Sequence, residues 1–335
     1  MTKLLVSLLE ETAFAKSGAV IKLHGLGYTT VEEVVATAAV ARKELNEFVG
    51  FDILAELENT AIAREGNKRL LSMAAIPPPE PKLGVLLARI PPECMVTISN
   101  KFRSVSKAAE LPRSVSLVRN LPPIRDQRHR GTCVAFATLS ALETPADDFS
   151  EQFVYALCKQ RDGVPDVEGT WLGTAYPILR DVGVCFEKTW PYVTEPIAGN
   201  EGQNPPPAAA MHEASSHRRS FISLTPTDVQ ELKAALAAGF VISFSIPAYA
   251  SWARNREVFR SGRIVMPLRG EQTPFGHAMA LVGYQDEAFE PGGGRFLLRN
   301  SWGKKWGEKC PFGAGYGTIP YQFIANDCRE AYCFS

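Results

Sequence analysis

The sequence lacks an excess of charge of either sign, because 36 lysines and arginines balance 36 aspartates and glutamates. Such a balance provides no general attraction for nucleic acid or for an anionic membrane, so we expect neither as a partner. No run of about 18 apolar residues occurs, and we therefore expect no transmembrane helix. The first apolar run is too short for a signal peptide, which predicts a cytoplasmic protein.

Cysteine is present without the spacing of a zinc site. The seven cysteines are an odd number and form no Cys-x-x-Cys pair, so we expect no metal and no cofactor. We interpret most of them as buried thiols in a reducing compartment. A disulfide among the last three stays open as an alternative, and these are Cys310, Cys328 and Cys333.

The 335 residues have an ordinary globular composition, with 45% hydrophobic and 21% charged residues. Three regions differ in character. Residues 1–75 are helix-like, the prolines of residues 76–110 predict a linker or extended arm, and residues 111–335 form the main domain. Because helical patterns precede strand patterns in the main domain, the fold class is expected to be α+β.

Local patterns predict the individual elements. In the first region Thr30 and Glu33 form a capping-box pattern before a helical stretch, Val31–Glu58, and two glycines before it predict a tight turn. In the main domain, helices are expected at Cys133–Leu142, Ser150–Lys159, Leu172–Val182 and Asp228–Gly239, and strands at Phe240–Ile246, Ala278–Tyr284 and Arg295–Arg299.

Four residues suit nucleophilic chemistry. Cys133 opens an apolar helix, where the helix dipole lowers the pKa of a thiol. His277 could serve as its base, and Asn300, which directly follows a predicted strand, could orient the imidazole. The amide of Gln127 could donate to an oxyanion. Taken singly, each has a structural alternative: a buried thiol, a core histidine, a turn residue and a surface glutamine.

From Leu111 onward the chain resembles the papain-like cysteine peptidases, over about 200 residues and with the motifs in family order. His277 follows Cys133 by 144 residues and Asn300 follows it by 167, against roughly 130–150 in the family. An insertion at Glu287–Gly294 is expected to lengthen a hairpin between them. The matching blocks are Leu111–Val115, Ile124–Gln127, Gly131–Ala137, Ser150–Gln152, Gly276–Ala278, Val282–Tyr284, Asn300–Gly303 and Trp306–Glu308.

The resemblance implies a two-lobed fold, with a helical lobe and an antiparallel β-barrel-like lobe, preceded here by a small helical domain. It implies Cys133 as nucleophile, His277 as acid and base, Asn300 as the orienting residue and Gln127 in the oxyanion hole. It also implies an apolar preference two residues before the scissile bond. The implied substrate-binding residues are Gly131, Gly169, Thr170, Trp171, Leu172, Phe275, Gly276, Trp302 and Trp306.

The chain departs from the family pattern around the nucleophile. Val134 replaces a tryptophan, and Arg130 and Val167 replace two cysteines that are usually joined, so that disulfide is absent. The loss of both cysteines fits a reducing compartment, and members from prokaryotes commonly have this pattern, so a bacterial origin is expected.

The extension before Leu111 has three interpretations. It is an inhibitory prosegment that makes the protein a zymogen, in which case the proline-rich arm of residues 76–110 is expected in or near the active-site cleft. Alternatively it is a permanent interaction or targeting domain, or a nucleic-acid-binding module. Residues Leu26–Val34 weakly resemble helix-hairpin-helix modules, but the stretch after them is net acidic, which disfavours nucleic acid. The expected function is a cysteine endopeptidase acting on proteins or peptides through a thioester. The alternatives are acyl transfer or deamidation on the same residues, or a catalytically silent binding protein.

Overall fold

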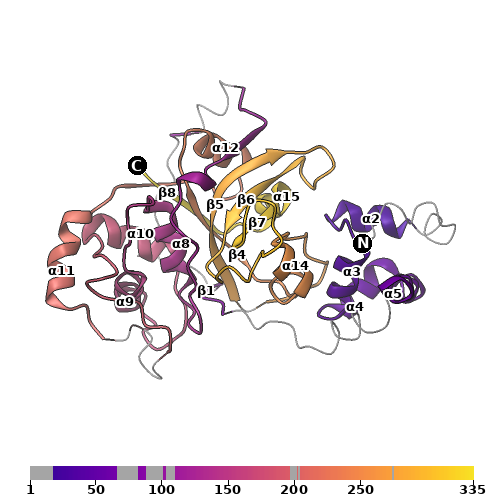
Figure 1. Cartoon of the computed structure of the whole chain (residues 1–335), viewed down its shortest axis with the longest axis horizontal. Coiled ribbons are helices and arrows are strands. Elements are labelled where there is room, and N and C mark those ends of the chain that lie inside the picture. Colours follow the sequence, from indigo (N-terminus) through magenta and orange to yellow (C-terminus); the bar gives the residue numbers. More distant parts are fainter. Residues whose placement is uncertain are drawn as a thin grey trace.

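The computed structural model describes residues 18–65, 82–87, 101–102, 110–196, 202, 204–273 and 275–335. A lobe of helices and a lobe built on a sheet meet along the middle of the molecule, and a group of N-terminal helices lies beside the sheet lobe (Figure 1). Within these ranges no helix has the length and apolar character needed to cross a membrane.

The helical lobe follows the predicted elements closely. Ser150 caps its second helix by accepting a hydrogen bond from the Phe153 N–H at 3.1 Å. The lobe contains α8 (Cys133–Leu142), α9 (Glu151–Arg161), α10 (Leu172–Asp181) and α11 (Ala208–Ala214), with short 3₁₀ turns at Val118–Asn120 and Ser215–His217.

The sheet lobe is organised around one long strand, β5 (Phe275–Asp286). The strand order is β3-β8-β4-β5-β6-β7, and two short N-terminal strands also pair with β5. This order has two ends, so the predicted barrel-like lobe is an open antiparallel sheet. The other strands are β1 (Val85–Leu86), β2 (Ser114–Ser116), β3 (Phe221–Ser223), β4 (Ile242–Pro247), β6 (Gly294–Arg299), β7 (Tyr316–Pro320) and β8 (Glu330–Phe334). Its helices are α12 (Val229–Ala237), α13 (Ala250–Ala253), α14 (Arg256–Ser261) and α15 (Tyr321–Asp327).

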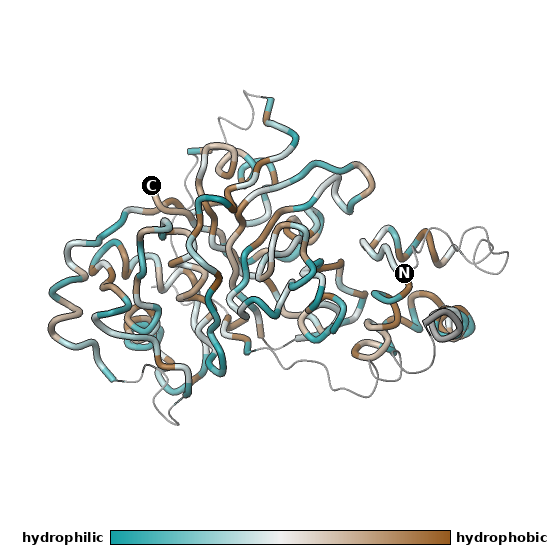
Figure 2. The backbone as a smooth tube through the Cα atoms, viewed as in Figure 1, coloured by the Kyte–Doolittle hydropathy of each residue, from teal (hydrophilic) through white to brown (hydrophobic). Residues whose placement is uncertain are grey.

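Apolar packing joins the two lobes along α8 and β5. Every residue of β4 is buried, and α8 is buried over its first seven residues. Hydrophobic stretches of the chain run through the middle of the molecule, while many outer loops are hydrophilic (Figure 2). The insertion between β5 and β6 extends their hairpin, as expected, and the Glu287 N–H donates to the Gly293 carbonyl at 3.0 Å.

The N-terminal helices confirm the predicted cap and correct the predicted length. The Glu33 N–H donates to the Thr30 hydroxyl at 3.2 Å, and the Thr30 N–H donates to the Glu33 carboxylate at 3.1 Å. The stretch predicted as one helical region is three helices, because Gly50 has a φ of 92° and ends one of them. The four helices are α2 (Ala19–Gly25), α3 (Val31–Ala38), α4 (Arg42–Val49) and α5 (Phe51–Glu65).

Buried polar contacts attach these helices to the sheet lobe. The Asn255 amide, which caps α14, donates to the Thr37 hydroxyl of α3 at 2.9 Å. The Met266 N–H donates to the Leu26 carbonyl at 2.9 Å. Asn255 and Met266 both lie outside the strands. The α2–α5 group therefore packs on the helices and loops of the sheet lobe and not on the sheet itself.

Candidate active site

Cys133 lies where the two lobes meet. It is the first residue of α8 and its side chain is fully buried. Its Sγ accepts a hydrogen bond from the backbone N–H of Ala278 on β5, at 3.4 Å. The helix start thus places the thiol against the strand that carries His277, 144 positions further along the chain.

The sheet register brings His277 and Asn300 together. His277 lies on β5, and Asn300 follows the last residue of the neighbouring strand β6. The His277 Nε2 and the Asn300 Oδ1 are 2.8 Å apart, and the same oxygen accepts the Ser301 N–H at 2.7 Å. His277 Nδ1 is buried without a hydrogen-bond partner among the described residues.

Tryptophans enclose the imidazole. The Trp302 ring lies 4.3 Å from the His277 ring between centroids, and Trp252 of α13 stacks on Trp302 at 6.2 Å. Trp306 packs perpendicular to Trp302 and is completely buried, and its place along the substrate path stays a prediction. No sequence pattern marked Trp252, because only the fold brings α13 to this place.

Gln127 is held so that its amide nitrogen faces the junction of the lobes. Its Oε1 accepts the Ser301 hydroxyl at 2.6 Å, and its backbone N–H donates to the Ser301 carbonyl at 2.8 Å. Its Nε2 donates to the Arg130 carbonyl at 2.8 Å and to the Lys82 carbonyl at 3.1 Å. The residue is buried, which overturns the alternative of a surface glutamine.

A segment from the N-terminal side, residues 82–87, occupies the cleft between the lobes; we call it the arm. Its strand β1 pairs antiparallel with Phe275 and Gly276 of β5 and makes a parallel bridge to Thr170. The Thr170 N–H donates to the Gly84 carbonyl at 2.9 Å, and the Leu86 N–H donates to the Thr170 carbonyl at 3.3 Å. The backbone of the arm therefore pairs with the backbone of both lobes at once.

The arm also covers the thiol. The Val85 side chain is 1% exposed and packs in the same cluster as Cys133, Leu172 and Ala278. Burial raises the pKa of Cys133 to about 12, against the opposing hydrogen bonds from backbone N–H groups that include Gly84. Burial likewise lowers the pKa of His277 to about 4. The thiol and imidazole are therefore neutral here, and the lowered thiol pKa expected from the helix dipole is wrong for this state, since desolvation outweighs it.

Most of the predicted substrate-binding residues contact the arm. A Cβ on Gly131 would lie 2.6 Å from the Leu83 carbonyl oxygen, and one on Gly169 would lie 2.8 Å from the Gly84 oxygen. Leu172 is buried in the cluster that holds Val85. Trp171 differs, because it is buried directly before α10 and its indole N–H has no hydrogen-bond partner among the described residues.

Two residues of α9 form hydrogen bonds with the backbone of Gly169. The Gly169 N–H donates to the Tyr155 hydroxyl at 3.0 Å, and the Lys159 ammonium donates to the Gly169 carbonyl at 2.8 Å. Lys159 also bonds Asp162 at 2.8 Å and the Val167 carbonyl at 2.6 Å, with its side chain 2% exposed. Tyr155 and Lys159 are four positions apart and therefore lie on one face of the helix. This spacing occurs in many helices, so it does not by itself mark a functional pair in a sequence.

Arg130 lies between two tyrosine rings, where the family pattern has a cysteine. Its guanidinium carbon is 5.2 Å from the Tyr155 ring centroid and 5.5 Å from that of Tyr192. The Tyr192 hydroxyl donates to the Gln127 carbonyl at 2.8 Å and is 2.7 Å from the Thr132 hydroxyl. The loop of Gln127 and the loop of Gly169 are thus joined through aromatic and charged side chains.

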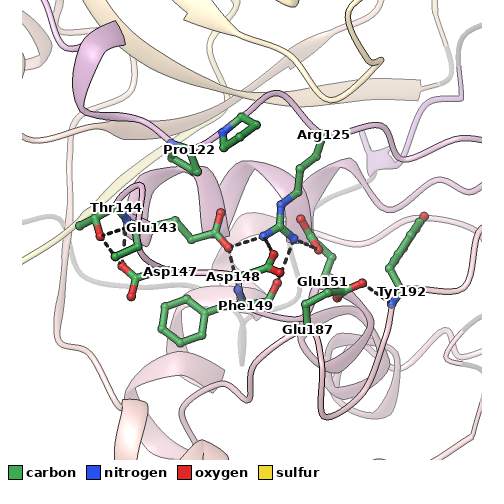
Figure 3. Close-up of polar contacts among 12 residues, drawn as sticks. Pro122, Arg125, Glu143, Thr144, Asp147, Asp148, Phe149, Glu151, Glu187 and Tyr192 are labelled. Carbon is green, nitrogen blue, oxygen red and sulfur yellow. Dashed lines mark hydrogen bonds and ion pairs between the residues drawn. The ribbon is translucent and has the colours of Figure 1, made fainter.

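A second charged side chain, the partly buried Arg125, supports the Gln127 loop (Figure 3). Arg125 donates to Glu151 at 2.6 Å and to Glu143 at 2.9 Å, and it also pairs with Asp148. Burial raises the pKa of both glutamates, and Arg125 opposes that rise. Since Arg125 precedes Gln127 by two residues, the cluster fixes the start of this loop.

A buried carboxylate missed by sequence reasoning anchors α10. Glu330 of β8 accepts the N–H groups of Gly173 at 2.7 Å and Leu172 at 3.3 Å, and the Ser245 hydroxyl at 3.1 Å. It satisfies backbone donors at the start of that helix. No local pattern could find it, because it lies 157 residues from its Gly173 partner.

The cysteines settle one open alternative. All six described cysteines are free and buried, so Cys310, Cys328 and Cys333 form no disulfide with one another. The seventh, Cys94, lies outside the described residues.

Comparison with known proteins identifies similar chains. The family model described as papain family cysteine protease matches residues 111–328. The chain is 26% identical over 249 residues to an uncharacterized peptidase C1-like protein of Acanthamoeba polyphaga mimivirus, covering 69% of this chain and 75% of that protein. It is 29% identical over 198 residues to cathepsin J of Rattus norvegicus, covering 55% of this chain and 54% of the cathepsin. The match thus spans about half the length of that second relative.

Solved structures show the same fold. Xylellain, a cysteine protease from Xylella fastidiosa, matches with a TM-score of 0.61 and 24% identity, over 77% of this chain and 97% of its own. Digestive procathepsin L 3 of Tenebrio molitor larval midgut matches with a TM-score of 0.55 and 17% identity, over 83% and 89%. At these identities the likeness concerns the fold alone.

Proposed function

We propose, from the premise that the chain belongs to the papain family of cysteine proteases, that it is an endopeptidase acting through Cys133, His277, Asn300 and Gln127. The observation that carries the proposal is the meeting of a thiol at a helix start with an imidazole held by an amide, at the junction of the lobes. Its substrates are proteins or peptides.

In each half of the reaction, His277 first accepts a proton and then returns it. His277 takes the Cys133 proton as Sγ bonds to the carbonyl carbon, and Gln127 Nε2 with the Cys133 N–H stabilises the oxyanion. The tetrahedral intermediate expels the amine, which receives the proton from His277, and a thioester remains. Water then loses a proton to His277 and attacks the thioester, the C–S bond breaks, and the thiol regains its proton. Asn300 keeps the imidazole oriented throughout.

The protein is made as a zymogen whose arm blocks this site. Two features support this: the Lys82 carbonyl accepts the Gln127 amide meant for the oxyanion, and the Gly84 N–H faces the thiol. The pair of neutral groups described above is the inactive state. Removal of the arm hydrates the site and brings the two pKa values toward each other.

The division into residues 1–75, 76–110 and 111–335 has a functional meaning in this proposal. The helices α2–α5 dock on the sheet lobe, and the arm, which comes later in the same N-terminal region, lies in the cleft. The N-terminal region is thus an intramolecular partner of the peptidase, and its docking contacts distinguish it from a free targeting module.

A glycine substitution tests the zymogen. A Cβ on Gly84 would overlap the Gly131 carbonyl, so Gly84→Ala should unseat the arm. We expect labelling of Cys133 by a thiol-directed epoxide, and hydrolysis of an extended fluorogenic peptide, to rise at least tenfold in the full chain. Gly25→Ala is the matched control, since its Cβ would meet open space. Equal and rapid labelling of wild type and Gly84→Ala would contradict an inhibitory arm.

A further inference from the structure

A carboxylate lies beside the nucleophile without a role in the mechanism. Glu168 directly precedes Gly169, and its side chain lies over Gly131, two residues before Cys133. A Cβ on Gly131 would lie 2.6 Å from the Glu168 Cγ and 3.1 Å from its Cδ. The charge of Glu168 also acts on Cys133, whose pKa it raises. The carboxylate therefore borders the place where chemistry occurs.

One oxygen of this carboxylate, Oε1, is buried and has no hydrogen-bond partner among the described residues. The nearby ammonium of Lys159 is committed to Asp162 and to the carbonyls of Val167 and Gly169, which flank Glu168 in sequence. A buried carboxylate oxygen without a partner loses hydration without compensation, so it favours binding of a cationic donor.

The arm explains why the partner is missing. Val85 bridges to Thr170, and its neighbour Gly84 is the arm residue beside Gly131 and the thiol. Having no side chain, Gly84 presents nothing to Glu168. A substrate must place the residue whose carbonyl is attacked, here termed the acyl residue, at this same position next to Sγ. Its side chain then runs over Gly131 toward Glu168.

We propose that Glu168 is a specificity-determining residue that selects lysine or arginine as the acyl residue of the substrate. The inference rests on the proposed peptidase function and adds its substrate class. A guanidinium or ammonium supplies the missing donor, and a charge-assisted hydrogen bond in a cleft sheltered from water is stronger than a neutral one. An acidic acyl residue is repelled by the same carboxylate.

Matched peptides and variants test the proposal. Three fluorogenic peptides, identical except for arginine, glutamine or glutamate as the acyl residue after a valine, are assayed with the full chain and with full-length Gly84→Ala. We expect kcat/KM for the arginine peptide to exceed that for the glutamine peptide about 10- to 100-fold. Glu168→Gln should remove most of this ratio while leaving cleavage of the glutamine peptide within about threefold, and Glu168→Lys should favour the glutamate peptide. Asp166→Asn, an exposed acid two residues away, should leave all three rates unchanged.

The outcomes separate this inference from the proposed function. If peptides are cleaved with the same kcat/KM whatever the acyl residue, or if Glu168→Gln keeps the arginine preference, Glu168 does not select the substrate and the peptidase function stands. If neither full-length form cleaves any of the peptides, the proposed function fails and this inference fails with it. A preference lost in both Glu168→Gln and Asp166→Asn would indicate a general field of the lobe and would also overturn the proposal.

Discussion

The two lobes place their share of the site by different means. In the sheet lobe, the ladder between β5 and β6 positions His277 and Asn300, and tryptophan packing encloses them. In the helical lobe, Gln127 and Gly169 lie on loops, and single charged side chains hold those loops: the partly buried Arg125 and the buried Arg130 and Lys159.

This difference indicates how strongly a single side-chain substitution should disturb each lobe. A strand register rests on many backbone hydrogen bonds, so one side chain contributes a small part of it. A loop held by one buried ammonium depends on that group, because its removal leaves a buried acid without its counter-charge. The absent disulfide belongs to the lobe with these charges, which here take over the joining of its loops.

The largest effect should come from removing the nucleophile, which lies where the two lobes meet. In the Gly84→Ala background, where the arm is displaced, Cys133→Ala removes the nucleophile, and we expect peptide hydrolysis to fall at least about 1,000-fold while the melting temperature stays close to that of Gly84→Ala alone. Cys158→Ala, another fully buried cysteine of the helical lobe, is the control and should keep most of the activity. Residual turnover near the Gly84→Ala rate in the double variant would show that a different group attacks the peptide.

A loop-holding charge should come next. Lys159→Met leaves Asp162 buried and unpaired, so we expect the free energy of unfolding to drop by about 3–5 kcal/mol. The KM for extended peptides should also rise, because Gly169 is freed. Urea unfolding and steady-state kinetics measure both, and Arg161→Met, a largely exposed position on the same helix, should change stability by less than about 1 kcal/mol. If the two variants behave alike, the helical lobe does not depend on this charge.

A side-chain change in the sheet lobe should be milder. Asn300→Ala removes the hydrogen bond to His277, but β5 and Trp302 still hold the ring, so we expect kcat to fall about 10- to 100-fold. A fall as severe as that of Cys133→Ala would mean that the amide, and not the strand, positions the imidazole, and the contrast between the lobes would lose its basis.

The last effect is spread over a wide pH range and concerns the Arg125 cluster, which Asp148 and Glu187 also face. Because burial raises the pKa of Glu143 and Glu151 in the folded state, their protonated forms stabilise the fold. That stability is present below about pH 4.3, the ordinary value for glutamate, and is lost as the pH rises through the raised values.

We expect the free energy of unfolding to decline across that window by at most about 1.4 kcal/mol per pH unit for each proton. Denaturant titrations at several pH values measure it, and Glu151→Gln should flatten the decline. A wild-type curve that rises over the same window would show that Arg125 outweighs the burial of the two acids.

Sequence reasoning succeeded where the information is local or lies in a motif. The helix at Cys133, the cap at Thr30, and the strands next to His277 and Asn300 follow from side-chain type and spacing. It failed where burial decides. Lys159 looked like an ordinary helix residue, and Glu330 has its partners far along the chain.

The error about the thiol has the same origin. A helix start lowers the pKa of a cysteine only where water can solvate the thiolate, and the sequence could not show that residues 82–87 exclude water from Cys133. The fold class was correct, while closure of the sheet depends on contacts between its end strands that no local pattern encodes.

The covalent continuity of the arm with the enzyme has a kinetic consequence. A blocking segment on the same chain acts at an effective concentration of the order of millimolar for a short linker, however dilute the protein is. A peptide at micromolar concentration competes poorly against it, and dilution alone does not release activity. Switching on the proposed zymogen therefore requires an event within each molecule, such as a cut in the chain or a shift of the docked helices, and the response scales with the number of molecules so altered.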